Sequence, residues 1–205
     1  MMNISVKDLE TAINFMGTKW SKQNNELDRK TKFIYDINSF NKLEKICKAT
    51  LSKKEDRQYA YHRWVNFCSS IYCEQLFCKY GATKVENNKD KEKDIYINDI
   101  PFDVKLTVFP DTSLEKYDLD TKEGREGLAN WFYNNQSGEG RYHNKNRLFV
   151  VCCGDTIEEK NKLKTNFSLI EEKIKEFMTK DMQNKIVILC RPETLIYVGF
   201  VMVKN

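Results

Sequence analysis

The hydrophobic pattern of the chain changes its period at Gly81, and this change constrains the fold more than any other feature. Before Gly81, apolar residues recur at helical spacing from a capping box at 52–55 through Leu76. After Gly81, short runs alternate between apolar and polar residues and predict three strands, at 83–86, 94–97 and 100–109. We therefore expect a long, mostly buried helix followed by three strands.

The rest of the pattern predicts further helices and strands. Apolar residues at helical spacing predict a helix that ends near Gln136. The run 147–153 is apolar on both faces, which is typical of a central strand. A capping box that begins at Thr156 opens one long amphipathic helix that extends to Phe177. Two apolar strands follow, at 185–190 and 195–203, so the order of elements is that of a mixed α/β domain.

The first fifty residues are expected to form accessory helices. Ser5 and Asp8 have the spacing of a capping box before one helix, and a second helix is predicted around Phe40 and Cys47. The polar stretch 17–32 between them is predicted to be a loop. With 205 residues, the chain is long enough for one domain. Its expected parts are an accessory helical region at 1–51, a core at 52–153, and a helix with two strands at 154–205.

The composition narrows the classes of protein that fit. No apolar run reaches the roughly 18 residues that a membrane helix needs, and residues 1–10 do not resemble a signal peptide, so we expect a cytoplasmic protein without a membrane partner. Seven cysteines are an odd number, and Cys68, Cys73 and Cys78 lie five residues apart. This spacing fits neither a zinc site nor a disulfide framework, and it favours reduced structural thiols.

The positive charge of the chain is concentrated near its N-terminus. The formal net charge is +4. Residues 1–63 contain 13 Lys and Arg against 8 Asp and Glu, whereas the remainder contains 21 against 22. This balance is compatible with nucleic-acid binding but does not require it, since a solvated helical face has the same composition.

The segment 93–105 carries the clearest pattern of chemically active residues. Asn and Asp tolerate positive φ, so residues 98–99 are predicted to form a two-residue hairpin turn. This register places Ile97 opposite Ile100 and Ile95 opposite Phe102, which directs these apolar side chains to the core. The opposite face then carries Asp94, Asp103 and Lys105.

The same register places Asp94 opposite Asp103. Two carboxylates in such a pair repel each other unless a cation neutralises them. Mg²⁺ takes one or two protein carboxylates together with water and phosphate oxygens, so Asp94 and Asp103 are candidate ligands. From the same face, the Lys105 ammonium can orient a water molecule or stabilise charge on a phosphate. Glu74 shares a helical stripe that is predicted to face the sheet, and its carboxylate needs either this metal site or a salt bridge to Lys or Arg.

These residues and their spacing resemble the PD-(D/E)XK nuclease superfamily, which has the restriction-endonuclease-like fold. The match covers about 52–153, and it implies a core of a helix, three strands, a helix and a strand, with a mixed sheet flanked by helices. By this resemblance, Asp94 takes the place of the first acid, 103–105 that of (D/E)XK, and Glu74 that of the helical Glu. Asp94 follows Lys93 rather than Pro, and the second acid is Asp rather than the commoner Glu.

The resemblance implies a Mg²⁺-dependent endonuclease that hydrolyses phosphodiester bonds in DNA, as restriction-type enzymes do, with Mn²⁺ as a substitute for Mg²⁺. In such enzymes the acids bind the metal and the Lys helps to activate water. Cutting both DNA strands at once requires two sites, which a homodimer would supply. Two alternatives stay open, namely a noncatalytic nucleic-acid-binding or interaction protein with the same fold, and a nuclease whose substrate is RNA.

The segment before the fourth strand mixes basic, aromatic and amide side chains. This mixture suits contacts to phosphate oxygens and base edges, although a surface loop without such a role has the same composition. The candidate nucleic-acid-binding residues are Gln136, Arg141, His143 and Lys145. Gln136 is a candidate because the second helix of the family packs near the motif strands.

Overall fold

The protein is described by a computed structural model that covers residues 4–16, 24–86, 93–110, 116–135, 145–180, 185–191 and 194–204. The chain forms two compact units, an N-terminal unit at Met1–Tyr72 and a C-terminal unit at Cys73–Asn205. Each is described by itself below. No helix among the described residues is long and apolar enough to cross a membrane.

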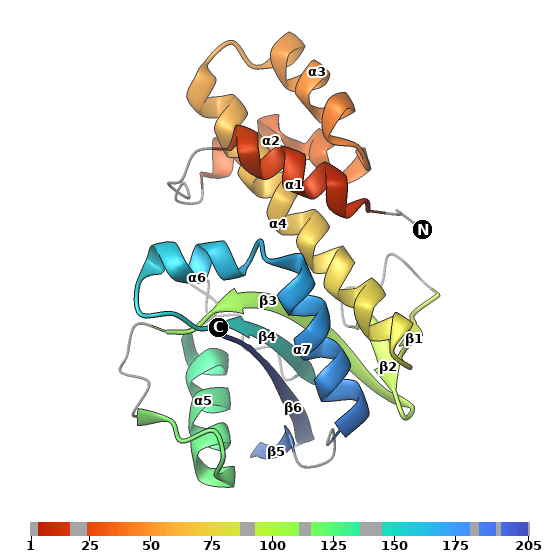
Figure 1. Cartoon of the computed structure of the whole chain (residues 1–205), viewed down its shortest axis with the longest axis vertical. Coiled ribbons are helices and arrows are strands. Elements are labelled where there is room, and N and C mark those ends of the chain that lie inside the picture. The colour runs from red at the N-terminus through yellow and green to blue at the C-terminus, as the bar shows by residue number, and fades with distance from the viewer. Residues whose placement is uncertain are drawn as a thin grey trace. The chain divides into compact units, whose positions relative to one another are not determined.

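The C-terminal unit is built on one mixed six-stranded sheet with the order β1-β2-β3-β4-β6-β5. The neighbours β1–β2, β2–β3 and β5–β6 are antiparallel, whereas β3–β4 and β4–β6 are parallel. The strands, labelled in Figure 1, are β1 (Thr83–Lys84), β2 (Ile95–Ile97), β3 (Ile100–Val108), β4 (Arg147–Cys152), β5 (Ile186–Arg191) and β6 (Thr194–Val203). The predicted α/β class and the central place of β4 are confirmed.

The β2–β3 hairpin has the predicted turn and register. Asn98 and Asp99 have φ angles of 48° and 64°, as a two-residue turn of this type requires. Ile97 pairs with Ile100 and Ile95 pairs with Phe102. The side chains of Ile95 and Phe102 are buried, which confirms that this face of the hairpin belongs to the core.

Helices cover both faces of the sheet. α5 (Lys122–Asn135) packs on one face, where the ring of Phe132 stacks on that of Phe149 with centroids 4.6 Å apart. On the other face, α7 (Phe167–Lys180) approaches Gly199 so closely that a β-carbon there would lie 3.2 Å from the Phe177 ring and 2.6 Å from Leu148. A small residue at position 199 is therefore needed for this helix to reach the sheet.

The single long helix predicted from Thr156 to Phe177 is wrong, because the chain forms two helices there. α6 (Ile157–Leu163) begins with the predicted capping box of Thr156 and Glu159. The chain then turns, and the side chain of Asn166 accepts a hydrogen bond from the backbone N–H of Leu169 in the first turn of α7. This amide starts a new helix without changing the apolar spacing, which is why periodicity alone did not reveal the break.

The N-terminal unit is helical, with α1 (Val6–Phe15), α2 (Asn25–Lys30), a 3₁₀ helix η1 (Lys32–Asp36), α3 (Phe40–Thr50) and the first part of α4 (Lys54–Lys79). The predicted capping box of α1 is wrong. Ser5 makes no side-chain capping bond, and Asp8 instead accepts a hydrogen bond of 2.8 Å from the backbone N–H of Phe40. Asp8 therefore stabilises the start of α3.

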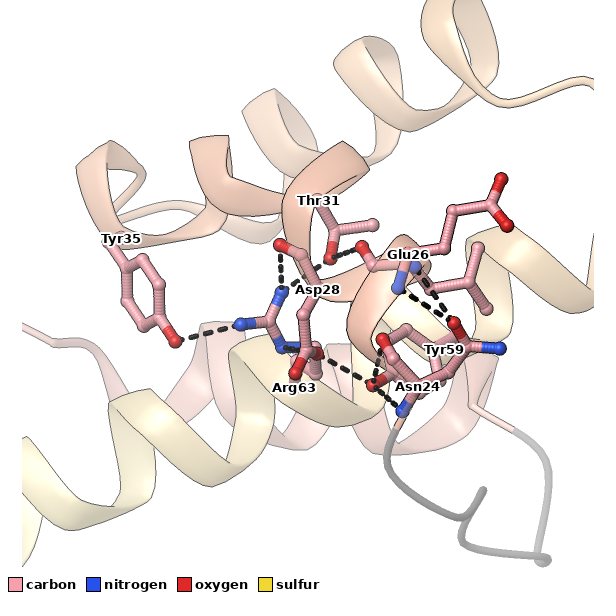
Figure 2. Close-up of polar contacts among 8 residues, drawn as sticks. Asn24, Glu26, Asp28, Thr31, Tyr35, Tyr59 and Arg63 are labelled. Carbon is pink, nitrogen blue, oxygen red and sulfur yellow. Dashed lines mark hydrogen bonds and ion pairs between the residues drawn. The ribbon is translucent and has the colours of Figure 1, made fainter.

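The loop predicted at 17–32 is wrong in its second half, where α2 forms. Asn24 caps this helix by accepting hydrogen bonds from two backbone N–H groups. Figure 2 shows how Arg63 of α4 fixes the segment, since its guanidinium pairs with Asp28 and donates to the hydroxyls of Thr31 and Tyr35. These partners lie in η1 and α2 or beside them. The structure of this segment therefore depends on contacts with α4, which a local sequence pattern does not reveal.

The long helix α4 ends at Lys79, just before the predicted stop at Gly81, whose φ of 114° glycine adopts readily. All seven cysteines are free thiols. Burial raises the pKa of both Cys47 and Cys152 to about 12, so these two thiols stay protonated at neutral pH.

Candidate functional site

The structure brings the four predicted site residues of the C-terminal unit into one electrostatic cluster, which we call the acidic cluster. It consists of Glu74, Asp94, Asp103 and Lys105. Glu74 lies on the last turns of α4, Asp94 directly precedes β2, and Asp103 and Lys105 lie on β3. Because three elements contribute to it, the cluster depends on the β2–β3 register and on the packing of α4.

Asp103 is buried, with 6% of its surface exposed, and it lies between two cations. Its Oδ1 atom is 2.8 Å from Nζ of Lys105, whose side chain is 44% exposed. Its Oδ2 atom is 3.3 Å from Nε of Arg147, but the pair lacks the geometry of a hydrogen bond. The Oδ2 atom of Asp103 is thus attracted by the charge of Arg147 but receives no hydrogen bond from it.

Arg147 is a site residue that the sequence analysis missed. It is the first residue of β4 and pairs with Asp103 in the parallel β3–β4 register. Its guanidinium lies 5.1 Å from the centre of the Tyr133 ring, which holds it in place on the side of α5. The signal that could have identified Arg147 is its position at the start of a strand predicted to be central.

Asp94 is tied to β3 by both its backbone and its side chain. Its N–H donates to the carbonyl of Phe102, and its carboxylate accepts a hydrogen bond of 2.8 Å from the N–H of Val104. Burial raises the pKa of Asp94, and the charge of Asp103 raises it further, against the opposing hydrogen bond from Val104 and the charge of Lys105. The effect of the Asp103 charge on Asp94 is the one expected of two carboxylates on one face.

Glu74 forms an ion pair with Lys84 of β1, a second residue that the sequence analysis missed. Burial raises the pKa of Glu74, and the charge of Asp94 adds to this effect, while the hydrogen bond and charge of Lys84 oppose it. Of the two partners expected for Glu74, the structure contains the salt bridge. Glu74 nevertheless lies close enough to Asp94 and Lys105 to respond to their charges.

Asn146 is one of the residues that hold β3 in place at Asp103. The backbone N–H of Asp103 donates to the carbonyl of Asn146, 3.0 Å away. The side chain of Asn146 donates to the carbonyl of Pro101 and accepts from the N–H of Tyr197. Asn146 therefore joins β3 to β6 at the edge of the cluster.

Among the described residues, no group of three or more His, Cys, Asp or Glu side chains has the arrangement to hold a metal ion. Mg²⁺ does not require such a group, because it commonly binds one or two carboxylates and keeps several waters. The partly buried carboxylate of Asp94 and the buried carboxylate of Asp103 fit this smaller requirement. Burial is the main cause of the raised pKa of Asp94, and Oδ2 of Asp103 receives no hydrogen bond from the described residues, so a cation bound here would stabilise both carboxylates in their charged form.

The candidate nucleic-acid residues are only partly within the described chain. Gln136, Arg141 and His143 lie outside the described residues. Lys145 is described, and its carbonyl accepts a hydrogen bond from the Tyr133 hydroxyl. A nucleic-acid role for these four residues stays a prediction.

A cavity of about 730 Å³ lies elsewhere in the C-terminal unit, near the ends of β4 and β6. Its lining mixes acids and cations, including Asp118, Arg125, Asp155 and Lys204, and it contains no residue of the acidic cluster. The residues that line this cavity do not form a recognisable catalytic arrangement. We therefore place the candidate site at the acidic cluster.

Comparisons with protein-family models, with curated proteins and with solved structures give no match for this chain. The function is therefore argued from the geometry of the acidic cluster.

Proposed function

We propose that this protein is a Mg²⁺-dependent nuclease of the PD-(D/E)XK superfamily that hydrolyses phosphodiester bonds in DNA. The observation that carries the proposal is the hairpin around Asn98 and Asp99, whose register sets Asp94, Asp103 and Lys105 together beside Glu74. The catalytic residues are then Asp94, Asp103, Lys105 and Glu74.

The order and direction of the elements support this proposal. Helix α4 is followed by the antiparallel strands β1, β2 and β3, then by α5, and then by β4 parallel to β3. The restriction-endonuclease-like core that the resemblance implies has the same order of a helix, three strands, a helix and a strand. Asp94 lies directly before β2, Asp103 on β3 and Glu74 on the preceding helix, an order that agrees with the one the resemblance implies.

Asp94 and Asp103 would hold Mg²⁺, or Mn²⁺ in its place, with Glu74 as a further ligand or as the acid that positions water. When bound, the ion would polarise the phosphate and lower the pKa of a water molecule. Hydrolysis breaks one P–O bond. The phosphorus gains a hydroxyl group and the leaving oxygen gains a proton.

The cations in and beside the acidic cluster have separate roles in this proposal. Lys105 is the catalytic cation, because its half-exposed ammonium can donate to the attacking water or to a phosphate oxygen while it stays close to Asp103. Arg147 is a positioning residue, since it is largely buried and lies against the other oxygen of Asp103. Lys84 balances the charge of Glu74.

A second function has its own support. The ion pairs of Glu74 with Lys84 and of Asp103 with Lys105 already neutralise two of the three acids. This arrangement also suits a noncatalytic nucleic-acid-binding or interaction protein. The two functions differ in their need for metal, because a binder should hold DNA equally well with Mg²⁺ and with a chelator.

The test is cleavage of duplex DNA and of RNA with Mg²⁺, with Mn²⁺ and with a chelator. Asp103→Asn preserves shape but removes the charge, so it should abolish metal-dependent cleavage. The matched control is Asp99→Asn in the same hairpin, because Asn also adopts the positive φ of that exposed position and cleavage should persist. Equal cleavage by the two variants would refute the proposal, and cleavage of RNA alone would change the substrate. Light scattering on the same sample tests the expected homodimer.

A further inference from the structure

The excess positive charge of this protein lies in its N-terminal unit. Met1–Tyr72 contains 13 Lys and Arg against 8 Asp and Glu, whereas Cys73–Asn205 contains 21 against 22. We propose that the exposed face of α3, which carries Lys42, Lys45 and Lys48, binds the phosphate backbone of duplex DNA. This inference rests on the proposed function, and it assigns the N-terminal unit a role in holding the substrate.

The two faces of α3 differ sharply in character. One face is buried and apolar, with Phe40, Leu43 and Cys47 at most 3% exposed. The exposed residues follow the opposite side of the helix, and they are Asn41, Lys42, Lys45, Lys48, Ala49 and Thr50. The three lysines are spaced three residues apart, so they form a stripe about 9 Å long.

α3 is the one helix in the described part of the N-terminal unit whose exposed residues include cations but no acid. The exposed residues of α1 include both Lys7 and Glu10, and those of α2 include both Lys30 and Glu26. Glu44 of α3 is half-buried and forms an ion pair with Lys48. The stripe therefore keeps a net positive charge.

The lysines at the centre and start of the stripe are available to a ligand. Lys42 and Lys45 have no ion pair within the described residues of the chain, and both are exposed. Arg63, in contrast, is occupied by Asp28, Thr31 and Tyr35 (Figure 2). The cations of the unit are thus divided between a structural cluster around Arg63 and the open stripe on α3.

Hydrogen bonds and aromatic contacts anchor the start of α3. Asp8 holds its first N–H group, and the indole of Trp64 donates to the carbonyl of Ile37 just before the helix. The Phe40 ring packs against the rings of Tyr61 and Trp64, with centroids 5.4 Å and 6.2 Å away. A helix held in this way presents its charges without a large loss of conformational entropy on binding.

Charge complementarity favours duplex DNA as the partner. Its phosphates form a dense and regular row of negative charge, and the major groove admits an α-helix. Lysine binds phosphates as a point charge, and such contacts hold the duplex without reading its sequence. The small side chain of Ala49 beside the lysines leaves room for close approach.

The test is the binding of a fluorescent DNA duplex in the presence of a chelator, where no metal-dependent cleavage takes place. The triple variant Lys42→Gln, Lys45→Gln, Lys48→Gln should bind more weakly than the unchanged protein. If each lysine makes one phosphate contact, the slope of log K against log salt falls by about 2.7. The factor by which affinity falls between 50 and 200 mM salt would then be about 40 times smaller for the variant than for the unchanged protein.

The control carries the same charge change at exposed positions of α6 and α7, as Lys162→Gln, Lys175→Gln, Lys180→Gln. It should keep the slope of the unchanged protein, and thermal unfolding should show that both variants are folded. Equal slopes for the two triple variants would overturn the inference. If the unchanged protein cleaves DNA with Mg²⁺ while the α3 variant binds normally, only this inference fails, whereas absence of both binding and cleavage would also refute the proposed function.

Discussion

Arg147 lies beside Asp103 across the parallel β3–β4 pair, with its Nε atom 3.3 Å from Oδ2 of the carboxylate. Both side chains are about nine-tenths buried, so neither charge is well solvated. Lys105 contacts the other oxygen of the same carboxylate. Asp103 therefore contributes both to the stability of the sheet and to the proposed chemistry.

Replacing Arg147 should destabilise the protein. Arg147→Gln leaves the buried Asp103 carboxylate with one cation, and we expect the free energy of unfolding to fall by about 2 kcal/mol. Urea denaturation measures this loss. Adding Asp103→Asn should cost less than the sum of the two single changes, because the charge that Arg147 balances is then absent. Full additivity would mean that the two side chains do not interact.

Asn146 should matter for stability more than its polar character suggests. Asn146→Ala removes two hydrogen bonds and leaves the carbonyl of Pro101 and the N–H of Tyr197 without their partner, at a cost of about 2 kcal/mol. The exposed Asn135→Ala is the control, because it loses only a local bond to the carbonyl of Trp131. A similar small loss in both variants would show that the link between β3 and β6 is unimportant.

The raised pKa of Asp94 predicts how its removal changes the pH dependence of stability. A carboxyl whose pKa is raised by folding is favoured in its protonated form, so its contribution is fully present below the unfolded pKa and is lost as the pH rises through the folded pKa. Asp94→Asn should therefore be more stable relative to the unchanged protein at pH 7 than at pH 3. Thermal melts at the two pH values test this, and the opposite sign would contradict the assignment.

The two lysines near Glu74 should affect its pKa unequally. Lys84 both donates a hydrogen bond to Glu74 and lowers its pKa by charge, whereas Lys105 acts by charge alone and more weakly. Lys84→Met should therefore raise the pKa of Glu74 more than Lys105→Met does. An NMR titration of the Glu74 carboxyl measures both shifts. Equal shifts would indicate that the ion pair with Lys84 does not form in solution.

The hairpin was predictable because its determinants are local. Asn98 and Asp99 accept positive φ, and the apolar residues on either side allow only one register that buries them all. The positions of Asp103 and Lys105 on one face follow directly from that register.

Arg147 and Asn146 were not predictable in the same way. Their places depend on a parallel pairing between segments that are more than forty residues apart, and no local pattern sets that register. The side chain of Asp8 illustrates the same limit, because it caps α3 rather than its own helix. The sequence did not reveal the roles of these polar side chains, because their partners are distant in the sequence.

In the proposed function, the acidic cluster hydrolyses phosphodiester bonds. The most direct test is nicking of supercoiled plasmid with Mg²⁺ by the unchanged protein, by Lys105→Ala and by the exposed control Lys175→Ala. We predict metal-dependent nicking by the unchanged protein and the control, and a loss of at least about a hundredfold for Lys105→Ala. Nicking by Lys105→Ala at the rate of the unchanged protein would contradict the proposed function.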